Sequence, residues 1–446
     1  MLVLFIILGN SAHIGIIDAG SSSTSVYMYQ FKYVSDPSTF DHVSYNGSII
    51  YKSINHSLAE AHNNSNIMSV LDPLLSYINV SALNLGLKLK EISFLLYCTS
   101  EMGKLSVFQQ KSILDDSFSY IQEHSEFSLL RNEFKILKGY EEATYAWLSV
   151  NKLMNNFNSS KTIPVFQVDG QSMKMAIEEN ANDPETLPFV NTITIANKKY
   201  PIFCNSWSEF GFENAVSNVH QFLFNNSIDE TPCSINGSTL TTELANGMTG
   251  SFISNSNFSY CYDLFSTYVF KKGKNFSFHD SLFGDVPLPE AIKTSPTVFA
   301  IGFPEYISSF FGFHSNITVS VLKQKSLSFS MMDYETASIQ YPQIPNINTS
   351  LSQQIALINI LDRGFGPVSH LQFKLPSTSI NPHWTLGAVL AARSPSNQNN
   401  DDNSRSIAAW VYTAVSFAFL FVMVLVGNIL YPKLYMKKTQ DEQLDV

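Results

Sequence analysis

The chain has 446 residues, of which 45% are hydrophobic and 13% aromatic, so it can bury a large core and has the length of roughly two or three domains. Its 27 basic and 37 acidic residues give a net charge of -10. With that balance, and with no basic stripe along the sequence, nucleic acid is excluded as a partner.

The chain begins with an apolar run, which is followed by a strand-turn-strand pattern. Residues 1–12 contain the run LVLFIIL and are expected to form a short signal segment. Residues 14–31, IGIIDAGSSSTSVYMYQF, predict two antiparallel strands joined by a tight Gly-Ser turn. Such a turn can simply connect the strands, or its uncovered backbone N–H groups can hold a phosphate while Asp18 organises a metal ion. This stretch alone leaves both alternatives open.

Strand-like and helix-like segments then alternate along the chain. The apolar runs at 94–97, 163–168 and 191–197 predict strands. Apolar residues recur every three or four positions in 141–157, which predicts a helix. From 225 to 300 the periodicity fades, and no elements are assigned there. The alternation is typical of an α/β fold.

One strand-turn-strand pattern occurs a second time. Residues 165–177, VFQVDGQSMKMAI, again run from a strand through a short Asp-Gly-Gln-Ser turn into another strand. This repetition suggests two halves of similar build that face each other across a cleft, each with a loop able to hold a phosphate.

The four cysteines show no metal-binding spacing. Cys233 and Cys261 can close a loop as a disulfide in an oxidising compartment. Cys98 and Cys204 are expected to be buried thiols.

The C-terminal part predicts a membrane anchor. Residues 392–406 are polar and predict a flexible stalk, and residues 407–431 carry no charged side chain and predict one transmembrane helix in a lipid bilayer. Aspartates precede this helix and lysines follow it, which places the tail, 432–446, in the cytoplasm. We therefore expect a single-pass type I membrane protein with an extracellular or lumenal body, at the plasma membrane or in the Golgi. Asn-x-Ser/Thr acceptors in the body fit such a glycoprotein.

Five motifs together resemble those of one known family. The segments DAGSSST, LYCTSEMGKL, KGYEEATYAWLSVN, QVDGQSMKMA and HWTLGAVL occur in that order along the chain. They are similar to the apyrase conserved regions of the ecto-nucleoside triphosphate diphosphohydrolases, the CD39-like apyrases of the GDA1/CD39 group. The resemblance implies two actin-like (ribonuclease-H-like) domains with a cleft between them. The first would span 13–162 and be completed by 367–391, and the second would span 163–366.

The resemblance also implies an activity, namely hydrolysis of the terminal phosphates of nucleoside tri- and diphosphates by water, with Ca²⁺ or Mg²⁺ as cofactor. Glu142 matches the position of the family's catalytic glutamate, and Ser172 matches the serine that helps to hold the attacking water. From the residues alone, the favoured interpretation of Glu142 is a solvated side chain at a helix start, where it interacts with the positive end of the helix dipole.

Further site residues follow from the same resemblance. It implies phosphate or nucleotide contacts from Ser21, Ser22, Ser23, Thr99, Ser100, Asp169, Gly170 and Lys174. It implies metal contacts, mostly through water, from Asp18, Thr99, Gln167 and Trp384.

Several positions depart from the family pattern. Gln167 stands where the family has an aspartate, Asp169 where it has a glycine, and Lys174 where it has the glutamine that orients the water. An ammonium group can donate a hydrogen bond to that water but cannot accept one. Glu101 and Gly103 replace a glycine and an arginine, and a carboxylate beside a polyphosphate repels it.

The aromatic pair that holds the base in animal members is also not recovered, because Ala356 and the Glu305-Tyr306 pair stand at the two positions. Two functions therefore remain open from the sequence. The first is a membrane-anchored nucleoside tri- and diphosphatase. The second is a catalytically impaired nucleotide-binding or interaction glycoprotein that retains the same fold.

Overall fold

The computed structural model describes most of the chain up to residue 393. The described residues are 13–31, 40–45, 48–61, 64–158, 161–179, 184–195, 198–208, 210–269, 286–287, 289–295, 297–313, 316–344, 346–364, 372–376 and 382–393. The expected signal segment, the transmembrane segment 407–431 and the tail 432–446 lie outside the described residues, as does the predicted stalk beyond 393.

The first sheet has six strands and contains the predicted N-terminal hairpin. Its strand order is β3-β2-β1-β7-β8, and β6 also pairs with β2. The strands are β1 (His13–Ala19), β2 (Thr24–Phe31), β3 (Phe40–His42), β6 (Tyr51–Ile54), β7 (Ile92–Cys98) and β8 (Ser128–Ile136). Because β1 is antiparallel to β2 and parallel to β7, the hairpin at 14–31 and the strand at 94–97 are both confirmed.

The second sheet repeats this pattern. Its order is β11-β12-β10-β9-β16-β17, and β9 is antiparallel to β10 and parallel to β16. The expected second strand-turn-strand unit is therefore confirmed. The strands are β9 (Val165–Val168), β10 (Met173–Glu178), β11 (Val190–Ile195), β12 (Lys198–Trp207), β16 (Thr297–Gly302) and β17 (Gln372–Lys374).

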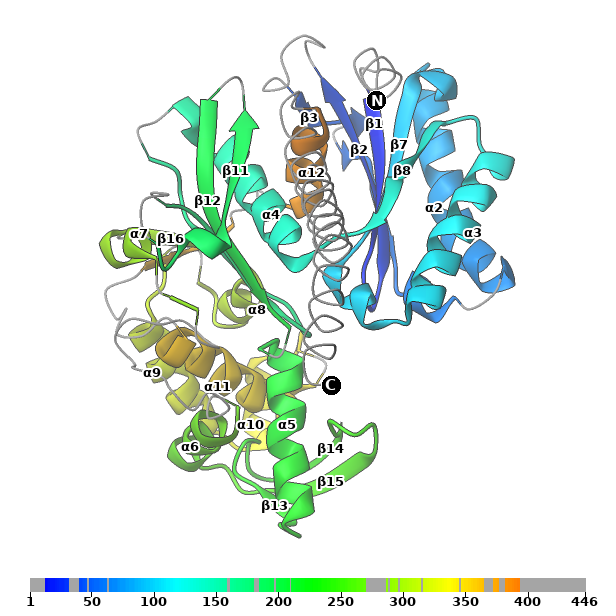
Figure 1. The fold of residues 1–446 in the computed structure, drawn as a ribbon. Helices are drawn as coiled ribbons and strands as arrows, with labels where there is room; N and C mark the ends of the chain where they lie inside the picture. The colour runs from blue at the N-terminus through cyan, green and yellow to red at the C-terminus, as the bar shows by residue number, and fades with distance from the viewer. Residues whose placement is uncertain are drawn as a thin grey trace, which may run out of the picture. The chain divides into compact units, whose positions relative to one another are not determined.

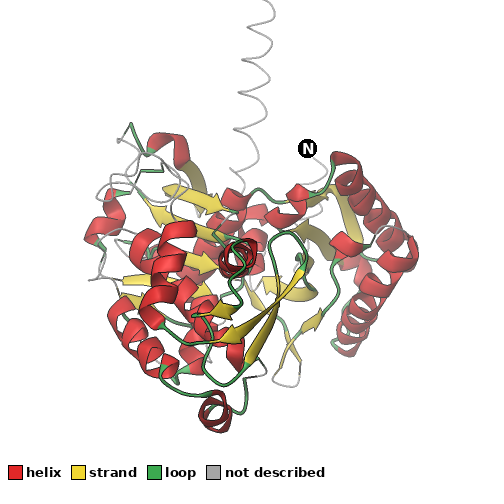
Figure 2. Ribbon diagram, turned by 90° about the horizontal axis from the view of Figure 1, so that it is seen from below, coloured by secondary structure: helices red, strands yellow, loops and turns green. Residues whose placement is uncertain are grey.

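Helices cover both faces of each sheet (Figures 1 and 2). Helices α2 (Asn64–Asn84) and α3 (Val107–His124) pack on the outer face of the first sheet. Helices α4 (Gly139–Leu153) and α12 (Trp384–Arg393) lie between the two sheets and pack on each other. The helices beyond the second sheet include α5 (Phe212–Asn225), α6 (Phe258–Tyr268), α8 (Phe303–Phe310), α9 (Val319–Ser330), α10 (Tyr334–Gln340) and α11 (Ile347–Gly364).

Two parts of this architecture differ from the sequence-based expectation. The region 225–300, where no element was assigned, contains regular structure in addition to α6 and β16. The further elements among its described residues are β13 (Glu230–Thr231), β14 (Thr239–Glu243), β15 (Thr249–Ser254) and α7 (Glu290–Thr294). Helix α12 also continues through Arg393, so it extends past the start of the predicted stalk.

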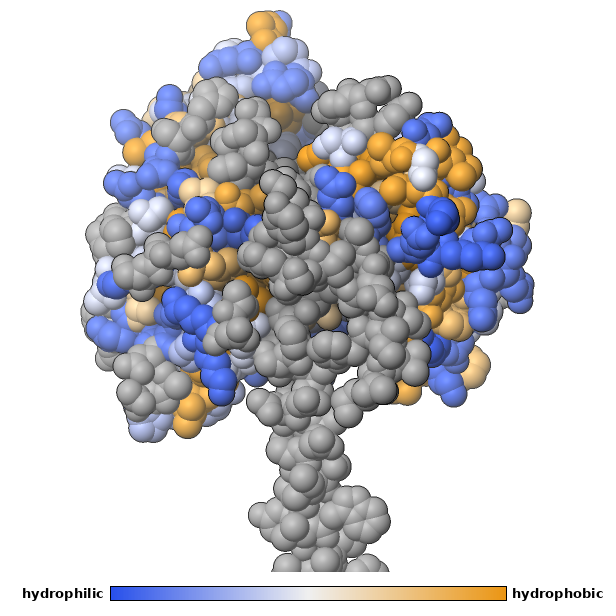
Figure 3. All heavy atoms as spheres, turned by 90° about the horizontal axis from the view of Figure 1, so that it is seen from above, coloured by the Kyte–Doolittle hydropathy of each residue, from blue (hydrophilic) through white to orange (hydrophobic). Residues whose placement is uncertain are grey.

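The layered order follows from side chains that are buried on both faces of the first sheet. In β1, Ile14 and Ile16 join the core shared with α4 and α12, whereas Ile17 and Ala19 join the core beneath α2 and α3. A strand that is covered on both faces is typically apolar along its length, and residues 14–17 of β1 form such an apolar run. On the face seen from above in Figure 3, hydrophilic and hydrophobic side chains are interspersed over the described surface.

A glycine allows the two central helices to approach closely. A Cβ atom at Gly387 would lie 1.9 Å from the carbonyl oxygen of Tyr145, so only glycine permits this distance between α12 and α4. The contact fixes the first turn of α12, which begins at Trp384, between the two sheets.

The cysteine predictions are confirmed. Cys233 and Cys261 form a disulfide with a Cα–Cα distance of 5.1 Å, which ties the start of α6 to the segment after β13. Cys98 and Cys204 are buried free thiols.

The membrane prediction is corrected. Within the residues that the structure describes, no helix combines the length and the apolar composition needed to cross a bilayer. This finding contradicts the expected single-pass type I topology with an extracellular or lumenal body. The segment 407–431, on which that expectation was based, lies outside the described residues.

Candidate active site

A cavity of about 910 Å³ is lined by residues from both halves of the fold. It lies at the carboxyl ends of β1 and β7 in the first sheet and of β9 and β16 in the second. Helices α4, α5, α8 and α12 contribute lining residues from their first turns. Strand ends and helix N-termini both present backbone N–H groups, and helix N-termini carry a partial positive charge. The helix N-termini therefore favour a phosphate at the cavity, whereas the acidic side chains of its lining call for a cation beside that phosphate.

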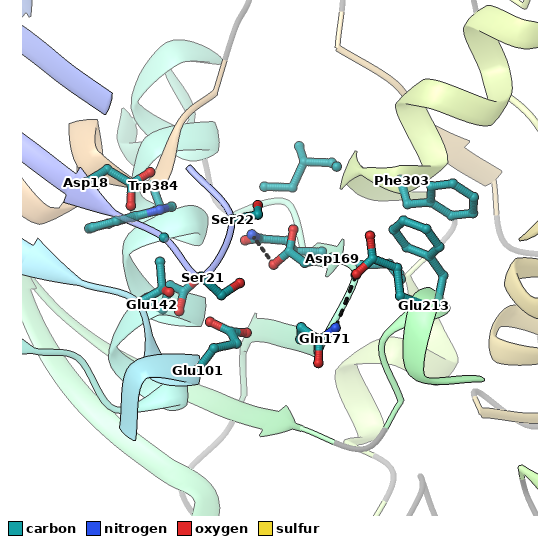
Figure 4. A pocket seen from close by; sticks show the side chains of 18 of the residues that line it. Asp18, Ser21, Ser22, Glu101, Glu142, Asp169, Gln171, Glu213, Phe303 and Trp384 are labelled. Carbon is teal, nitrogen blue, oxygen red and sulfur yellow. Dashed lines mark hydrogen bonds between the residues drawn. The ribbon is translucent and has the colours of Figure 1, made fainter. Parts of the chain in front are cut away.

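The two predicted loops contribute to the same cavity (Figure 4). In the β1–β2 loop, the Gly20 N–H donates to the Ser23 carbonyl oxygen at 2.9 Å, and Ser57 Oγ donates to the Gly20 carbonyl oxygen at 2.7 Å. In the β9–β10 loop, the Asp169 N–H donates to the Ser172 carbonyl oxygen at 2.8 Å. These bonds fix both turns, so each loop presents a defined backbone surface to the cavity.

Helix α5 holds the β9–β10 loop in place. The Phe212 N–H donates to the Asp169 carbonyl oxygen at 3.1 Å, and Gln171 Nε2 donates to Glu213 Oε2 at 3.2 Å. A Cβ atom at Gly211 would lie 2.2 Å from the carbonyl oxygen of Gly170, so only glycine at 211 lets the start of α5 approach the loop this closely. Glu213 was not predicted from the sequence to have a role. Glu213 lies in the first turn of α5, two residues after Gly211, and this acidic residue at a helix start was the available signal.

The structure divides the predicted site residues into those that line the cavity and those that do not. Those that line the cavity are Asp18, Ser21, Ser22, Thr99, Glu142, Gln167, Asp169, Gly170 and Trp384. Those that do not line it are Ser23, Ser100, Ser172 and Lys174. The motifs are thus brought together as expected, whereas the roles of the individual residues stay predictions.

Two buried oxygen atoms at the cavity suit a divalent cation. In the described part of the chain, Asp18 Oδ1 and Gln167 Oε1 are buried and have no hydrogen-bond partner. The Gln167 Nε2 donates to Asp169 Oδ2 at 2.8 Å, which leaves the carbonyl oxygen as the unpaired end of the amide. Carboxylate and amide oxygens are the ligand types that Ca²⁺ and Mg²⁺ prefer. Among the described residues, no group of three or more His, Cys, Asp or Glu side chains is arranged to hold a metal, so this donor set would be completed by water.

Burial and neighbouring carboxylates raise the pKa of two side chains at the cavity, Asp18 and Glu142. Burial raises the pKa of Asp18 well above its usual range, and the charges of Glu142, Asp169 and Glu101 add to the rise. Burial likewise raises the pKa of Glu142, whereas the charge of Lys174 opposes that rise. The site therefore has an excess of negative charge that a cation would offset.

Lys174 lies within this acidic cluster. Its Nζ is 2.7 Å from Asp169 Oδ2, 2.9 Å from Glu142 Oε1, 2.8 Å from Ser172 Oγ and 3.5 Å from Glu101 Oε1. Burial lowers the pKa of Lys174, but the three carboxylates outweigh that effect and raise the pKa above its ordinary value. The ammonium group therefore stays charged.

An aromatic wall closes the cavity on the side of the second sheet. The rings of Phe212 and Phe303 stack with centroids 3.7 Å apart, and the Tyr306 ring lies 5.7 Å from that of Phe303. All three residues line the cavity, whereas Ala356 is fully buried in the core. Neither Phe212 nor Phe303 was predicted from the sequence. Their signal was their place, each directly after a glycine and at a helix start.

His383 is another lining residue that the sequence analysis did not assign. Its Nε2 lies 3.4 Å from Asp18 Oδ2, and its ring stacks on Tyr27 with centroids 4.4 Å apart. The residue directly precedes Trp384 in the motif HWTLGAVL, which was the only sequence signal for it.

Known proteins resemble this chain in sequence and in fold. The probable apyrase 4 of Arabidopsis thaliana is 25% identical over 244 residues, which cover 53% of this chain and 47% of that protein. The Golgi apyrase of Schizosaccharomyces pombe is 24% identical over 350 residues, which cover 68% of this chain and 59% of that protein. The aligned regions thus span about half the length of these curated relatives.

A solved structure shows the fold. A crystal structure of nucleoside triphosphate hydrolases from Neospora caninum matches with a TM-score of 0.58 and 10% identity, covering 85% of this chain and 92% of that one. This match, together with the two six-stranded sheets, confirms the expected actin-like nucleotidase fold. The family model for GDA1/CD39 (nucleoside phosphatase) matches residues 6–405, nearly the whole chain. The chain therefore belongs to the GDA1/CD39 (nucleoside phosphatase) family.

Proposed function

We propose that this protein is a nucleoside tri- and diphosphatase that transfers the terminal phosphoryl group of its substrate to water. One observation carries the proposal, namely that the carboxylate of Glu142 lines the same cavity as the two unpartnered oxygens of Asp18 and Gln167. A base for the water and donors for a cation are the two requirements of metal-assisted phosphoryl transfer. The apyrase names of the relatives agree with this chemistry.

The two loops would bind the phosphate chain. Ser21 and Ser22 on one side and Gly170 on the other offer backbone N–H groups, and the serines add hydroxyl donors. The first turns of the helices around the cavity favour negative charge at the same place. The exposed ring of Tyr306, beside Phe303, would stack on the nucleoside base.

Glu142 would act as the general base. Its Oε2 lies 3.4 Å from the Ser100 backbone nitrogen and 3.2 Å from Ser100 Oγ, both of which donate to it, and its Oε1 faces the ammonium group of Lys174. Each carboxylate oxygen has two lone pairs, so Glu142 can still accept a proton from a water molecule in the cavity. The water would attack the terminal phosphorus in line with the bond to the leaving nucleotide.

A divalent cation would complete the site. Ca²⁺ or Mg²⁺ held by Asp18 and Gln167, with Thr99 and Trp384 beside it and partly through water, would offset the charge of the phosphoryl group.

Phosphate release tests the proposal. The purified full-length protein should release inorganic phosphate from at least one nucleoside di- or triphosphate in a panel of bases when Ca²⁺ or Mg²⁺ is present. A chelator should stop the release, and added metal should restore it. A folded protein that binds nucleotides but releases no phosphate from any of them would contradict the proposed function.

A further inference from the structure

Lys174 joins parts of the site that come from different sheets. It lies on β10 of the second sheet, whereas Glu142 is on α4 and Glu101 is on the short helix Ser100–Lys104 that follows β7 of the first sheet. The side chains of Lys174, Glu142 and Glu101 are only 1%, 2% and 9% exposed. This buried ion cluster therefore connects the two halves of the fold beneath the cavity.

All the hydrogen-bonding capacity of the ammonium group is used within the protein. A lysine ammonium has three N–H donors. Three acceptors lie within hydrogen-bonding distance, which are Asp169 Oδ2 at 2.7 Å, Ser172 Oγ at 2.8 Å and Glu142 Oε1 at 2.9 Å. Lys174 does not line the cavity, so it has neither a free donor nor access for a contact with a phosphate.

We propose that Lys174 is a positioning residue whose ammonium group is a built-in cation, which offsets part of the negative charge of Glu101, Glu142 and Asp169 and fixes the orientation of Glu142 at the cavity. Its effect on catalysis rests on the proposed function, whereas the charge balance does not. In this role Lys174 acts on the reaction through Glu142 and makes no contact with the substrate.

The arrangement of the neighbouring groups supports this role. Glu142 is held at both oxygens, by Lys174 at Oε1 and by Ser100 at Oε2, so its carboxylate plane is fixed. The Ser172 hydroxyl donates to Glu101 and accepts from Lys174, which links a third group to the same cation. A neutral amide at position 174 would keep two donors but would leave three carboxylates near one another without a counter-charge.

A double-mutant cycle in urea unfolding tests the charge balance without any turnover. In the wild-type background, Glu142→Gln should lower the unfolding midpoint because it removes a partner of Lys174. In the Lys174→Met background the same change should raise the midpoint, because it removes one of three uncompensated carboxylates. If Lys174→Met alone does not fold, recovery of folding by the added Glu142→Gln is the same expected result.

Glu141→Gln serves as the matched control and should shift the midpoint equally in both backgrounds, because Glu141 bonds to Lys135 and to the Lys138 backbone instead. If Glu142→Gln also has the same effect in both backgrounds, the proposal is overturned. If Lys174→Met folds neither alone nor together with Glu142→Gln, the cycle is repeated with Lys174→Gln. Opposite effects of Glu142→Gln in the two backgrounds then support the proposal, and equal effects overturn it.

The catalytic consequence is measured separately. Lys174→Met should lower kcat by about tenfold or more, with KM for the nucleotide within about threefold, because Glu142 is misplaced while the phosphate loops are intact. Lys174→Arg, which keeps the charge, should retain more of kcat than Lys174→Met does. An increase in KM with unchanged kcat would show a direct substrate contact and contradict the positioning role. Glu142→Gln could lower the unfolding midpoint in the wild-type background and raise it in the Lys174→Met background while the wild-type protein hydrolyses no nucleotide. In that case only the proposed function is contradicted.

Discussion

Glu142→Gln is expected to lower kcat by about two to four orders of magnitude. The amide keeps the size of the side chain and its reach to Ser100, but it cannot take the proton from the attacking water. Because the phosphate loops and the aromatic wall are untouched, the dissociation constant for a nucleotide should change by no more than about twofold. Steady-state phosphate release and equilibrium nucleotide binding measure the two quantities on the same preparation.

Glu141→Gln is the matched control for this prediction. Glu141 is the preceding residue on α4 and does not line the cavity, and its Oε2 accepts a hydrogen bond of 2.8 Å from the Lys138 backbone. Its replacement should leave kcat within about twofold. If the two variants have similar activity, Glu142 is not the base.

Asp18→Asn is expected to raise the metal concentration needed for half-maximal activity by about 10- to 100-fold. The change removes the negative charge that would hold the cation, whose unpartnered oxygen Oδ1 is buried at the cavity. In metal-free buffer the unfolding midpoint should not fall, because the carboxylate that is replaced is buried among the charges of Glu142, Asp169 and Glu101. Metal titration of activity and thermal unfolding in a chelator check the two parts.

The two expected results for Asp18→Asn distinguish a metal-binding role from a structural one, because the metal requirement rises while the unfolding midpoint does not fall. A residue with a purely structural role would lose stability and activity together. Asp263→Asn, at an exposed aspartate on α6 that does not line the cavity, should change neither quantity. An unchanged metal requirement in Asp18→Asn would place the cation elsewhere.

The parts of the fold that could be predicted are those with strong local signals. Residues 14–31 and 165–177 each combine two apolar strands with a turn of small residues, and both hairpins formed as expected. The short strands and helices between 225 and 300 could not be predicted, because they pack through long-range contacts and a disulfide instead of following a clear period.

Most residues of the site could be predicted from the sequence, but which of their side chains are buried beneath the cavity could not. Lys174 pairs with Gln167 in the β9–β10 register, so its place in the loop region follows from the motif. That its side chain runs beneath the cavity depends on Glu142 and Glu101, which come from the other sheet and are distant in sequence. His383 was missed because stacking on Tyr27 and proximity to Asp18 arise only when α12 packs between the sheets.

Hydrolysis in ¹⁸O-labelled water tests the central claim most directly, because the claim is that water attacks the terminal phosphorus of a nucleotide bound in this cavity. With the full-length protein, metal and the best nucleotide of the panel, the account predicts one labelled oxygen in each released phosphate and none in the remaining nucleoside phosphate. The Glu142→Gln protein should show the same labelling at a much lower rate. Label in the nucleoside product, or no phosphate release from the folded wild-type protein, would contradict the account.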